Sequence, residues 1–261
     1  MLGHQSAYAK VCRQENYIGA NFDIDEEGSF TLMNAQHIYN IIVAAGSGSR
    51  FGAALPKQYC LMNGRPVLMH TIENMRRALP QSQIVLVLNR DFVDYWTELC
   101  VKYSFMSPKV VEGGDTRWQS VKNAIDEIPA DAQVITVHDG ARPFATWQLI
   151  DRVVRAANSY GAAAPAIPVK DTIKEVNGGI VKGTPDRDTL RAVQTPQVFD
   201  FDLLRGALKK AILEEAKITD DCSAIENMGM SVKIVEGDER NIKITTPLDL
   251  KMAELIWEEM Q

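Results

Sequence analysis

A glycine-rich segment followed by two cations is the clearest chemical signal in the sequence. The apolar run 40–45 leads directly into Gly46-Ser47-Gly48-Ser49-Arg50, and Lys57 follows seven residues after Arg50, behind Pro56. Glycines after a buried strand let backbone amides approach a bound anion closely. Two fixed cations beside such a loop suit a triphosphate. The spacing matches neither standard phosphate-binding loop, and a purely structural turn is the alternative.

Two acidic residues follow later turns and strands. Asp115 follows Gly113-Gly114, and Asp139 comes after the apolar run 134–137. From the residues alone, each suits the N-cap of a following helix, and for Asp115 a cap is compatible with a ligand contact.

Other polar residues near these blocks have structural interpretations as well. His138 is expected to be a packed strand residue and not a base, because no catalytic partner is visible. Lys243 lies in NIKITT and could be a solvated charge on an edge strand. Arg117 could be an ordinary surface charge at the start of a helix. Asp220 and Asp221 are expected to begin or cap a turn.

These residues must be positioned by an alternation of short β-branched runs and amphipathic stretches that starts at Tyr39. Apolar runs without alternation predict strands buried on both faces, and therefore a mostly parallel sheet with helices on both faces. Strands are predicted near 40–45, 84–88, 109–111, 134–137, 162–169 and 231–235. Helices are predicted near 66–78, 91–102, 115–127, 146–159, 200–216 and from 247. The fold class is a Rossmann-like α/β sandwich, in which ligands bind at the carboxyl ends of the strands.

A β-hairpin arm over about 170–188 interrupts this alternation. The segment 171–186 predicts two polar strands joined at Asn177-Gly178-Gly179. A hairpin with so many polar residues contributes few side chains to a hydrophobic core. We therefore expect it to project from the sheet and to contact a second copy of the chain. A merely solvated surface hairpin is the alternative.

The first 36 residues differ from the rest. They have no apolar core with a cleavage site, and the acidic run from Asp23 to Glu27 argues against an organellar transit peptide. We expect residues 1–36 to be an N-terminal extension of unknown role, poorly ordered or the product of an upstream start, since Met33 offers another. Residues 37–261 are expected to form the functional domain.

Composition narrows the class of protein further. The 261 residues are 46% hydrophobic and 24% charged, which is typical of soluble globular proteins. Lys and Arg total 28 against 34 Asp and Glu, for a net charge of -6, which argues against nucleic-acid binding. No apolar run approaches the ~20 residues of a membrane span. Four scattered cysteines without C-x-x-C favour reduced thiols in a cytoplasmic protein.

Seven ordered blocks resemble the signature of the 2-C-methyl-D-erythritol 4-phosphate cytidylyltransferase family, over about 39 to 258. Two positions depart from the commonest family pattern, Val43 in place of proline and Gly140 in place of alanine, and neither removes a charge or a hydrogen-bonding side chain. The blocks are Ala44-Ala45-Gly46-x-Gly48-x-Arg50 with Lys57-Gln58; Gly113-Gly114-Asp115-x-Arg117-x-x-Ser120; Val137-His138-Asp139-Gly140-Ala141-Arg142-Pro143; 168–174; Gln194-Thr195-Pro196-Gln197; Thr219-Asp220-Asp221; and 241–245.

The resemblance implies an enzyme that joins CTP to 2-C-methyl-D-erythritol 4-phosphate and releases pyrophosphate, in non-mevalonate isoprenoid biosynthesis, with Mg²⁺ required. It implies catalytic roles for Arg50 and Lys57, which would neutralise the triphosphate and the transition state, and for Lys243, which would lie by the α-phosphate. It implies CTP binding by Ala44, Ala45, Gly46, Gly48, Gly114, Asp115, Ser120 and Asp139, with Asp139 also meeting the metal. It implies acceptor binding by Arg142, Thr172, Arg187 and Thr195. Thr172 and Arg187 flank the arm and would act on the partner subunit's substrate, which makes a homodimer functionally necessary.

Two rival functions remain on the same fold. A ribitol-5-phosphate cytidylyltransferase would share the CTP chemistry, the Q-T-P-Q block and the N-I-K-I-T-T-P segment. The A-A-G loop, the P-V-K-D-T-I-K block and the Asp186-Arg187 pair favour methylerythritol phosphate. A catalytically idle nucleotide-binding protein is the other rival, and the retained cations argue against it, because simple binding does not require charge to be balanced in a transition state.

Overall fold

The computed structural model describes residues 22–24, 30–32, 37–46 and 55–260. The chain divides into two compact units, 1–35 and 36–261. In the first, β1 (Phe22–Ile24) pairs antiparallel with β2 (Phe30–Leu32). All other described elements belong to the second unit. The prediction of an extension over 1–36 concerns residues that lie mostly outside the described ones.

The second unit alternates strands and helices over the ranges that the periodicity predicts, within a few residues. Its strands are β3 (Ile38–Ala44), β4 (Leu61–Met62), β5 (Arg65–Pro66), β6 (Gln83–Leu88), β7 (Lys109–Glu112), β8 (Val134–Asp139), β9 (Ala162–Pro168), β10 (Glu175–Asn177), β11 (Ile180–Gly183), β12 (Arg191–Val193), β13 (Gln197–Asp200) and β14 (Lys233–Glu236). Its α-helices are α2 (Val67–Ala78), α3 (Val93–Lys102), α4 (Arg117–Asp126), α5 (Trp147–Tyr160), α6 (Phe201–Leu213), α7 (Asp221–Asn227) and α8 (Pro247–Glu259). Short 3-10 helices are η3 (Lys57–Tyr59), η4 (Arg90–Phe92) and η5 (Arg187–Thr189).

The main sheet is mixed but mostly parallel, as predicted. Its strand order is β12-β9-β13-β8-β3-β6-β7, with β14 pairing β9. The pairs β8-β3, β3-β6, β6-β7 and β9-β14 are parallel, whereas β13 runs antiparallel to both of its neighbours and β12 to β9. The sequence pattern missed β12 and β13, which are three and four residues long.

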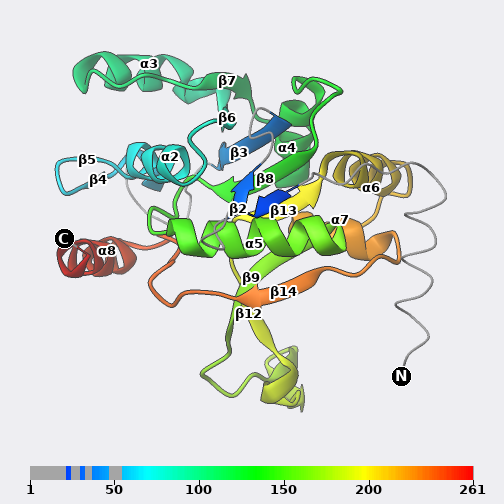
Figure 1. Ribbon diagram of the computed structural model, residues 1–261. Helices are drawn as coiled ribbons and strands as arrows, with labels where there is room; N and C mark the ends of the chain where they lie inside the picture. Colours follow the sequence, from blue (N-terminus) through cyan, green and yellow to red (C-terminus); the bar gives the residue numbers. More distant parts are fainter. Residues whose placement is uncertain (1–21, 25–29, 33–36, 47–54, 261) are drawn as a thin grey trace. The chain divides into compact units, whose positions relative to one another are not determined.

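Helices cover both faces of this sheet (Figure 1). The helices α2 and α5 pack on one face, and α4, α6 and α7 pack on the other. On the second face lies an apolar cluster in which Ile41, Val137 and Phe199 from the strands meet Val121 of α4 and Leu204 of α6. The fold is therefore the predicted α/β sandwich, with β8 and β3 at its centre.

The hairpin arm is formed by β10 and β11, and it extends from β9 and β12 at the bottom of Figure 1. Gly178 and Gly179 both have positive φ, 57° and 79°, which is the backbone that a two-residue hairpin turn requires. Val176, Ile180 and Val181 are all more than half exposed. The predicted turn is confirmed, and the arm leaves apolar side chains without cover.

Among the described residues, none of the helices combines the length and apolar character needed to cross a bilayer. Of the described cysteines, Cys60, Cys100 and Cys222 are free thiols, and Cys222 is buried, while Cys12 lies outside the described residues.

Candidate functional site

The candidate site lies at the carboxyl ends of β3 and β8, which are parallel neighbours. Val43 of β3 is in register with Asp139 of β8, and the Gly140 amide donates a hydrogen bond to the Val43 carbonyl at 2.9 Å. A Cβ on Gly140 would lie 2.9 Å from the Ala44 Cβ, so glycine permits this close approach. Asp139 is therefore held beside the segment Ala44–Gly46, the described part of the predicted anion loop.

Gln58 anchors the segment that follows this loop. Its buried side chain donates hydrogen bonds to the carbonyls of Ala44 at 2.7 Å and Gly46 at 3.2 Å. Its neighbour Lys57 begins η3 directly behind Pro56. Gln58 thus fixes the backbone position of Lys57 relative to the loop. Nothing in the sequence indicates this role for Gln58 beyond its place next to Lys57. Gly48 and Arg50 lie outside the described residues.

The Gly113-Gly114 turn packs against the same loop. A Cβ on Gly113 would lie 2.4 Å from the Ala45 Cβ and 3.0 Å from the Ser120 Oγ, so the turn requires glycine. The Gly114 amide donates to the Ser120 Oγ at 3.1 Å, so this hydroxyl shapes the turn. The expectation that Asp115 caps the helix is wrong: Thr116 is the N-cap of α4, in a capping box with Gln119.

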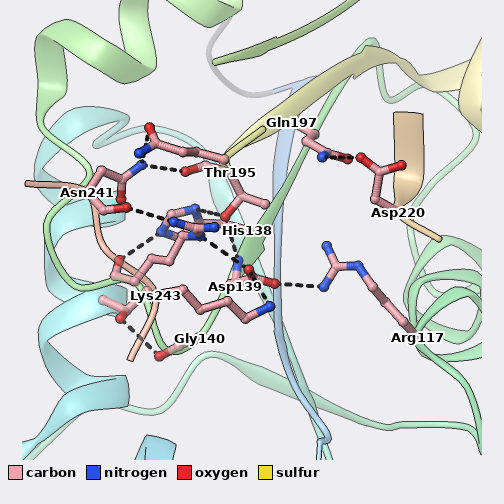
Figure 2. Close-up of polar contacts among 12 residues, drawn as sticks. Arg117, His138, Asp139, Gly140, Thr195, Gln197, Asp220, Asn241 and Lys243 are labelled. Carbon is pink, nitrogen blue, oxygen red and sulfur yellow. Dashed lines mark hydrogen bonds and ion pairs between the residues drawn. The ribbon is translucent and has the colours of Figure 1, made fainter. Parts of the chain in front are cut away.

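Asp139 is the centre of the charge arrangement (Figure 2). Its Oδ1 lies 2.8 Å from Arg117 Nη1, and its Oδ2 lies 2.9 Å from Lys243 Nζ and 3.3 Å from Arg142 Nε. Burial by itself would raise the pKa of this carboxyl, but the charges of Arg117, Lys243 and Arg142 outweigh it and hold the pKa far below its usual range. Asp139 is consequently ionised at neutral pH. It caps no helix, since α5 begins after Thr146.

Arg117 is not an ordinary surface charge. It bridges two carboxylates, because its Nη2 lies 2.7 Å from Oδ2 of Asp221 while its Nη1 contacts Asp139. Asp221 is 1% exposed, and its Oδ1 has no hydrogen-bond partner among the described residues. Burial raises the pKa of Asp221, and Arg117 opposes that rise. Asp220 is the N-cap of the helix α7 and Asp221 its first residue, where the expectation was a turn.

Lys243 comes from an irregular segment and not from an edge strand, so that interpretation is wrong. Its side chain is 39% exposed, and its Nζ reaches Asp139 from the side opposite Arg117 (Figure 2). The segment is fixed by Asn241, whose amide donates to the Thr195 carbonyl at 2.9 Å, and by the Ile244 amide, which donates to the Ala141 carbonyl at 2.9 Å. Among the described residues, Arg117, Arg142 and Lys243 thus all contact the carboxylate of Asp139.

The predicted acceptor-binding residues fall in two places. Arg142 and Thr195 lie at the Asp139 cluster: Arg142 Nη1 donates to the Asn241 carbonyl at 2.7 Å, and the buried Thr195 hydroxyl accepts from the Asp139 amide at 3.0 Å. Thr172 and Arg187 are exposed and flank the arm. Arg187 Nη1 donates to the Lys170 carbonyl at 3.0 Å, beside a hollow that Arg191 also lines.

The protein side of a metal site would consist of one carboxylate. Among the described residues, no three His, Cys, Asp or Glu side chains gather to hold a metal by themselves. Mg²⁺ is commonly bound by one or two carboxylates together with substrate phosphates and waters. The ionised Asp139 at the strand edge fits that mode.

Comparisons with known proteins assign this site to a family. The family model for 2-C-methyl-D-erythritol 4-phosphate cytidylyltransferase matches residues 38–259. The chain is 42% identical over 221 residues to a protein of that name from Desulforamulus reducens, covering 84% of this chain and 94% of that protein. It is 43% identical over 215 residues to one from Bacillus cereus, covering 82% and 95%. The crystal structure of 4-diphosphocytidyl-2C-methyl-D-erythritol synthase from Anaerococcus prevotii superposes with a TM-score of 0.74 at 31% identity, covering 86% of this chain and 97% of that one.

Proposed function

Because this chain belongs to the 2-C-methyl-D-erythritol 4-phosphate cytidylyltransferase family, we infer that it transfers the cytidylyl group of CTP to 2-C-methyl-D-erythritol 4-phosphate. The products are pyrophosphate and 4-diphosphocytidyl-2-C-methyl-D-erythritol, an intermediate of non-mevalonate isoprenoid biosynthesis. The structural observation that carries this proposal is the gathering of Arg117, Arg142 and Lys243 around Asp139, beside the Ala44–Gly46 loop.

The reaction needs charge neutralisation more than proton transfer. An oxygen of the acceptor phosphate attacks the α-phosphorus, and the bond from that phosphorus to the bridging oxygen of the leaving pyrophosphate breaks. The attacking oxygen is already an anion, so no general base is required. Two unit charges about 4 Å apart repel by about 1 kcal/mol in water and about 4 kcal/mol at an effective dielectric of 20. Cations at the reacting phosphates therefore lower the barrier more than any base would.

Three segments of the chain are proposed to bind CTP. Lys57 and Lys243, with Arg50, neutralise charge at the α-phosphate and in the transition state. The backbone of the loop from Ala44 to Gly48 cradles the phosphates. The Gly114–Ser120 turn, with Asp115, surrounds the cytosine. The packing of Gly113 on Ala45 and the anchoring of the loop by Gln58 support this division, because they join the two binding segments into one surface.

Mg²⁺ is proposed as the metal, held by Asp139 and by phosphate oxygens. When bound, it supplies further neutralisation of the triphosphate. Asp139 itself orients Lys243 and Arg142 through its Oδ2, so that both cations face the same side of the strand edge.

The acceptor side is proposed to need two copies of the chain. Arg142 contacts the acceptor directly. The buried Thr195 hydroxyl contributes by accepting a hydrogen bond from the Asp139 amide, which holds the backbone of the site in place. Thr172 and Arg187 of the arm reach the acceptor in the partner subunit. The uncovered Val176, Ile180 and Val181 support a homodimer gripped through the arm at about 170–188. We further propose that the enzyme is cytoplasmic, acts on small molecules alone, and carries residues 1–36 as an extension to a catalytic domain of 37–261.

A pyrophosphate-release assay tests the proposal. The protein is incubated with CTP and Mg²⁺, and with methylerythritol 4-phosphate or ribitol 5-phosphate in parallel, and an excess of chelator provides the metal-free control. Release with methylerythritol 4-phosphate alone is the expected result. Release with ribitol phosphate alone would overturn the acceptor and keep the CTP site. If folded protein binds CTP but releases no pyrophosphate with either acceptor, the chain is a catalytically idle nucleotide-binding protein.

A further inference from the structure

His138 is a buried polar residue that the reaction as described does not use. It lies next to Asp139 on β8 and is 1% exposed. Both of its ring nitrogens are nevertheless engaged: Nε2 lies 3.0 Å from the Arg142 carbonyl oxygen, and Nδ1 lies 2.9 Å from the Thr195 hydroxyl (Figure 2). Buried ring nitrogens need partners in any core, and here both partners belong to the candidate site.

The chemistry of the partners fixes the direction of these hydrogen bonds. A carbonyl oxygen can only accept, so Nε2 carries the hydrogen and donates to Arg142. In a neutral imidazole the other nitrogen is then an acceptor. The Thr195 hydroxyl therefore donates to Nδ1, while its oxygen accepts the Asp139 amide hydrogen at 3.0 Å. With this one tautomer, all three buried hydrogen bonds are satisfied together.

These bonds hold both ends of the turn that carries Asp139 and Arg142. The Arg142 amide donates to the Asp139 carbonyl at 3.1 Å, which closes the turn. His138 then fixes the Asp139 end through Thr195 and the Arg142 end directly. The side chains of that turn meet Lys243 and the Asn241 carbonyl, so the direction of the turn sets the direction of the cations.

We propose that His138 is a positioning residue of the transferase site: its Nε2–H tautomer holds the Asp139–Arg142 turn, through the Arg142 carbonyl and the Thr195 hydroxyl, in the orientation that acceptor binding and transfer require. This assignment rests on the proposed function. On the cytosine side, the hydrogen bond from the Gly114 amide to the Ser120 hydroxyl involves none of these groups, although Arg117 of the same segment contacts Asp139. A disturbed turn therefore lowers kcat and raises the KM for the acceptor more than it raises the KM for CTP.

Matched substitutions separate the two hydrogen bonds. His138→Asn keeps an acceptor near the Nδ1 position, His138→Gln keeps a donor near the Nε2 position, and His138→Phe keeps only a ring. We expect kcat divided by the acceptor KM to fall by about 100-fold in the Phe variant, the scale of a misplacement of about 1 Å. Smaller losses are expected in the Asn and Gln variants. When Thr195→Val is added to each variant, His138→Asn and His138→Phe should have the same kcat divided by the acceptor KM.

His70→Gln is the control for simple destabilisation. His70 is also a buried histidine bonded to a carbonyl, that of Met62 at 2.8 Å, but it lies on α2 and packs against Trp257. Folded His70→Gln should keep wild-type kinetic constants. Equal kinetic losses in the His70 and His138 variants, measured per folded molecule, would overturn the positioning role. Wild-type constants in folded His138→Asn and Thr195→Val would overturn it too, even if His138→Phe fails to fold.

Nitrogen-15 NMR of labelled imidazoles gives a readout that needs no activity. The expected spectrum shows His138 as neutral with its hydrogen on Nε2. A hydrogen on Nδ1 would overturn the inference even in an active enzyme. Absence of turnover in a wild type that shows the expected tautomer would count against the proposed function and not against the hydrogen-bond arrangement.

Discussion

Replacing Arg117 by methionine should leave a buried carboxylate without its partner. Asp221 is 1% exposed and makes its side-chain hydrogen bond through Oδ2, at 2.7 Å, to Arg117. Removing one member of a buried ion pair costs about 3–5 kcal/mol, because the remaining charge keeps its desolvation penalty. Asp139 loses one contact as well but keeps Arg142 and Lys243. We therefore expect Arg117→Met to lower the free energy of unfolding by about 3–5 kcal/mol at pH 8.

The pH dependence of this loss identifies its source. Burial already raises the pKa of Asp221, and loss of Arg117 raises it further. Between the unfolded and the folded pKa the folded state binds more protons, so stability falls as pH rises through that window. The cost of Arg117→Met should therefore be smaller at pH 5.5 than at pH 8. A neutral amide at the same place, in Asp221→Asn, should remove most of that difference.

A double-mutant cycle tests this explanation. Urea unfolding is measured for the wild type, both single variants and the double variant. The double variant Arg117→Met/Asp221→Asn should be more stable than Arg117→Met alone, with a coupling energy between 0.5 and about 3 kcal/mol, the range for residues in contact. A double variant as unstable as Arg117→Met would refute the reasoning, because the damage would then not come from the stranded Asp221. A single-variant cost below about 1 kcal/mol would also refute it.

Three further outcomes are expected. Lys57→Ala should lower kcat in the pyrophosphate assay by about 100-fold or more while circular dichroism stays unchanged, and near-normal kcat would contradict its catalytic role. Burial lowers the pKa of His138 to about 4, so the unfolded state binds a proton at higher pH than the folded state does. The free energy of unfolding should therefore fall by about 3 kcal/mol as the pH drops from 6.5 to 4. Urea unfolding of His138→Asn should show a shallower pH dependence, and a slope equal to that of the wild type would exclude this histidine as the cause. Ile180→Lys with Val181→Lys should give a monomer in sedimentation without loss of stability, since these side chains are 66% and 55% exposed, and an unchanged dimer would place the interface elsewhere.

Local patterns in the sequence were sufficient for most of the fold. The continuous apolar runs at β3, β6 and β8 indicate strands buried on both faces, and Asn177-Gly178-Gly179 specifies its turn because only residues that tolerate positive φ fit there. The position of Asp139 at the end of a buried strand also placed it at the edge where the candidate site lies. Each of these signals depends on neighbours within a few residues.

The function of individual polar side chains depended on contacts between distant parts of the chain. Arg117 is 104 residues from Asp221, and the Asp139 amide is 56 residues from the Thr195 hydroxyl. Nothing near Arg117 in sequence distinguishes it from a surface charge at the start of a helix. The antiparallel insertion of β13 between β8 and β9 brings Thr195 to the site, and it left no periodic pattern.

The sequence by itself therefore determined the alternation of strands and helices, the arm and the edge at which the candidate site lies, because these follow from hydrophobic periodicity and local backbone preference. Only the tertiary structure decided which charges are paired. The free energy of an ion pair or a buried hydrogen bond depends on separation and desolvation in space, and packing sets both for residues that the sequence keeps far apart.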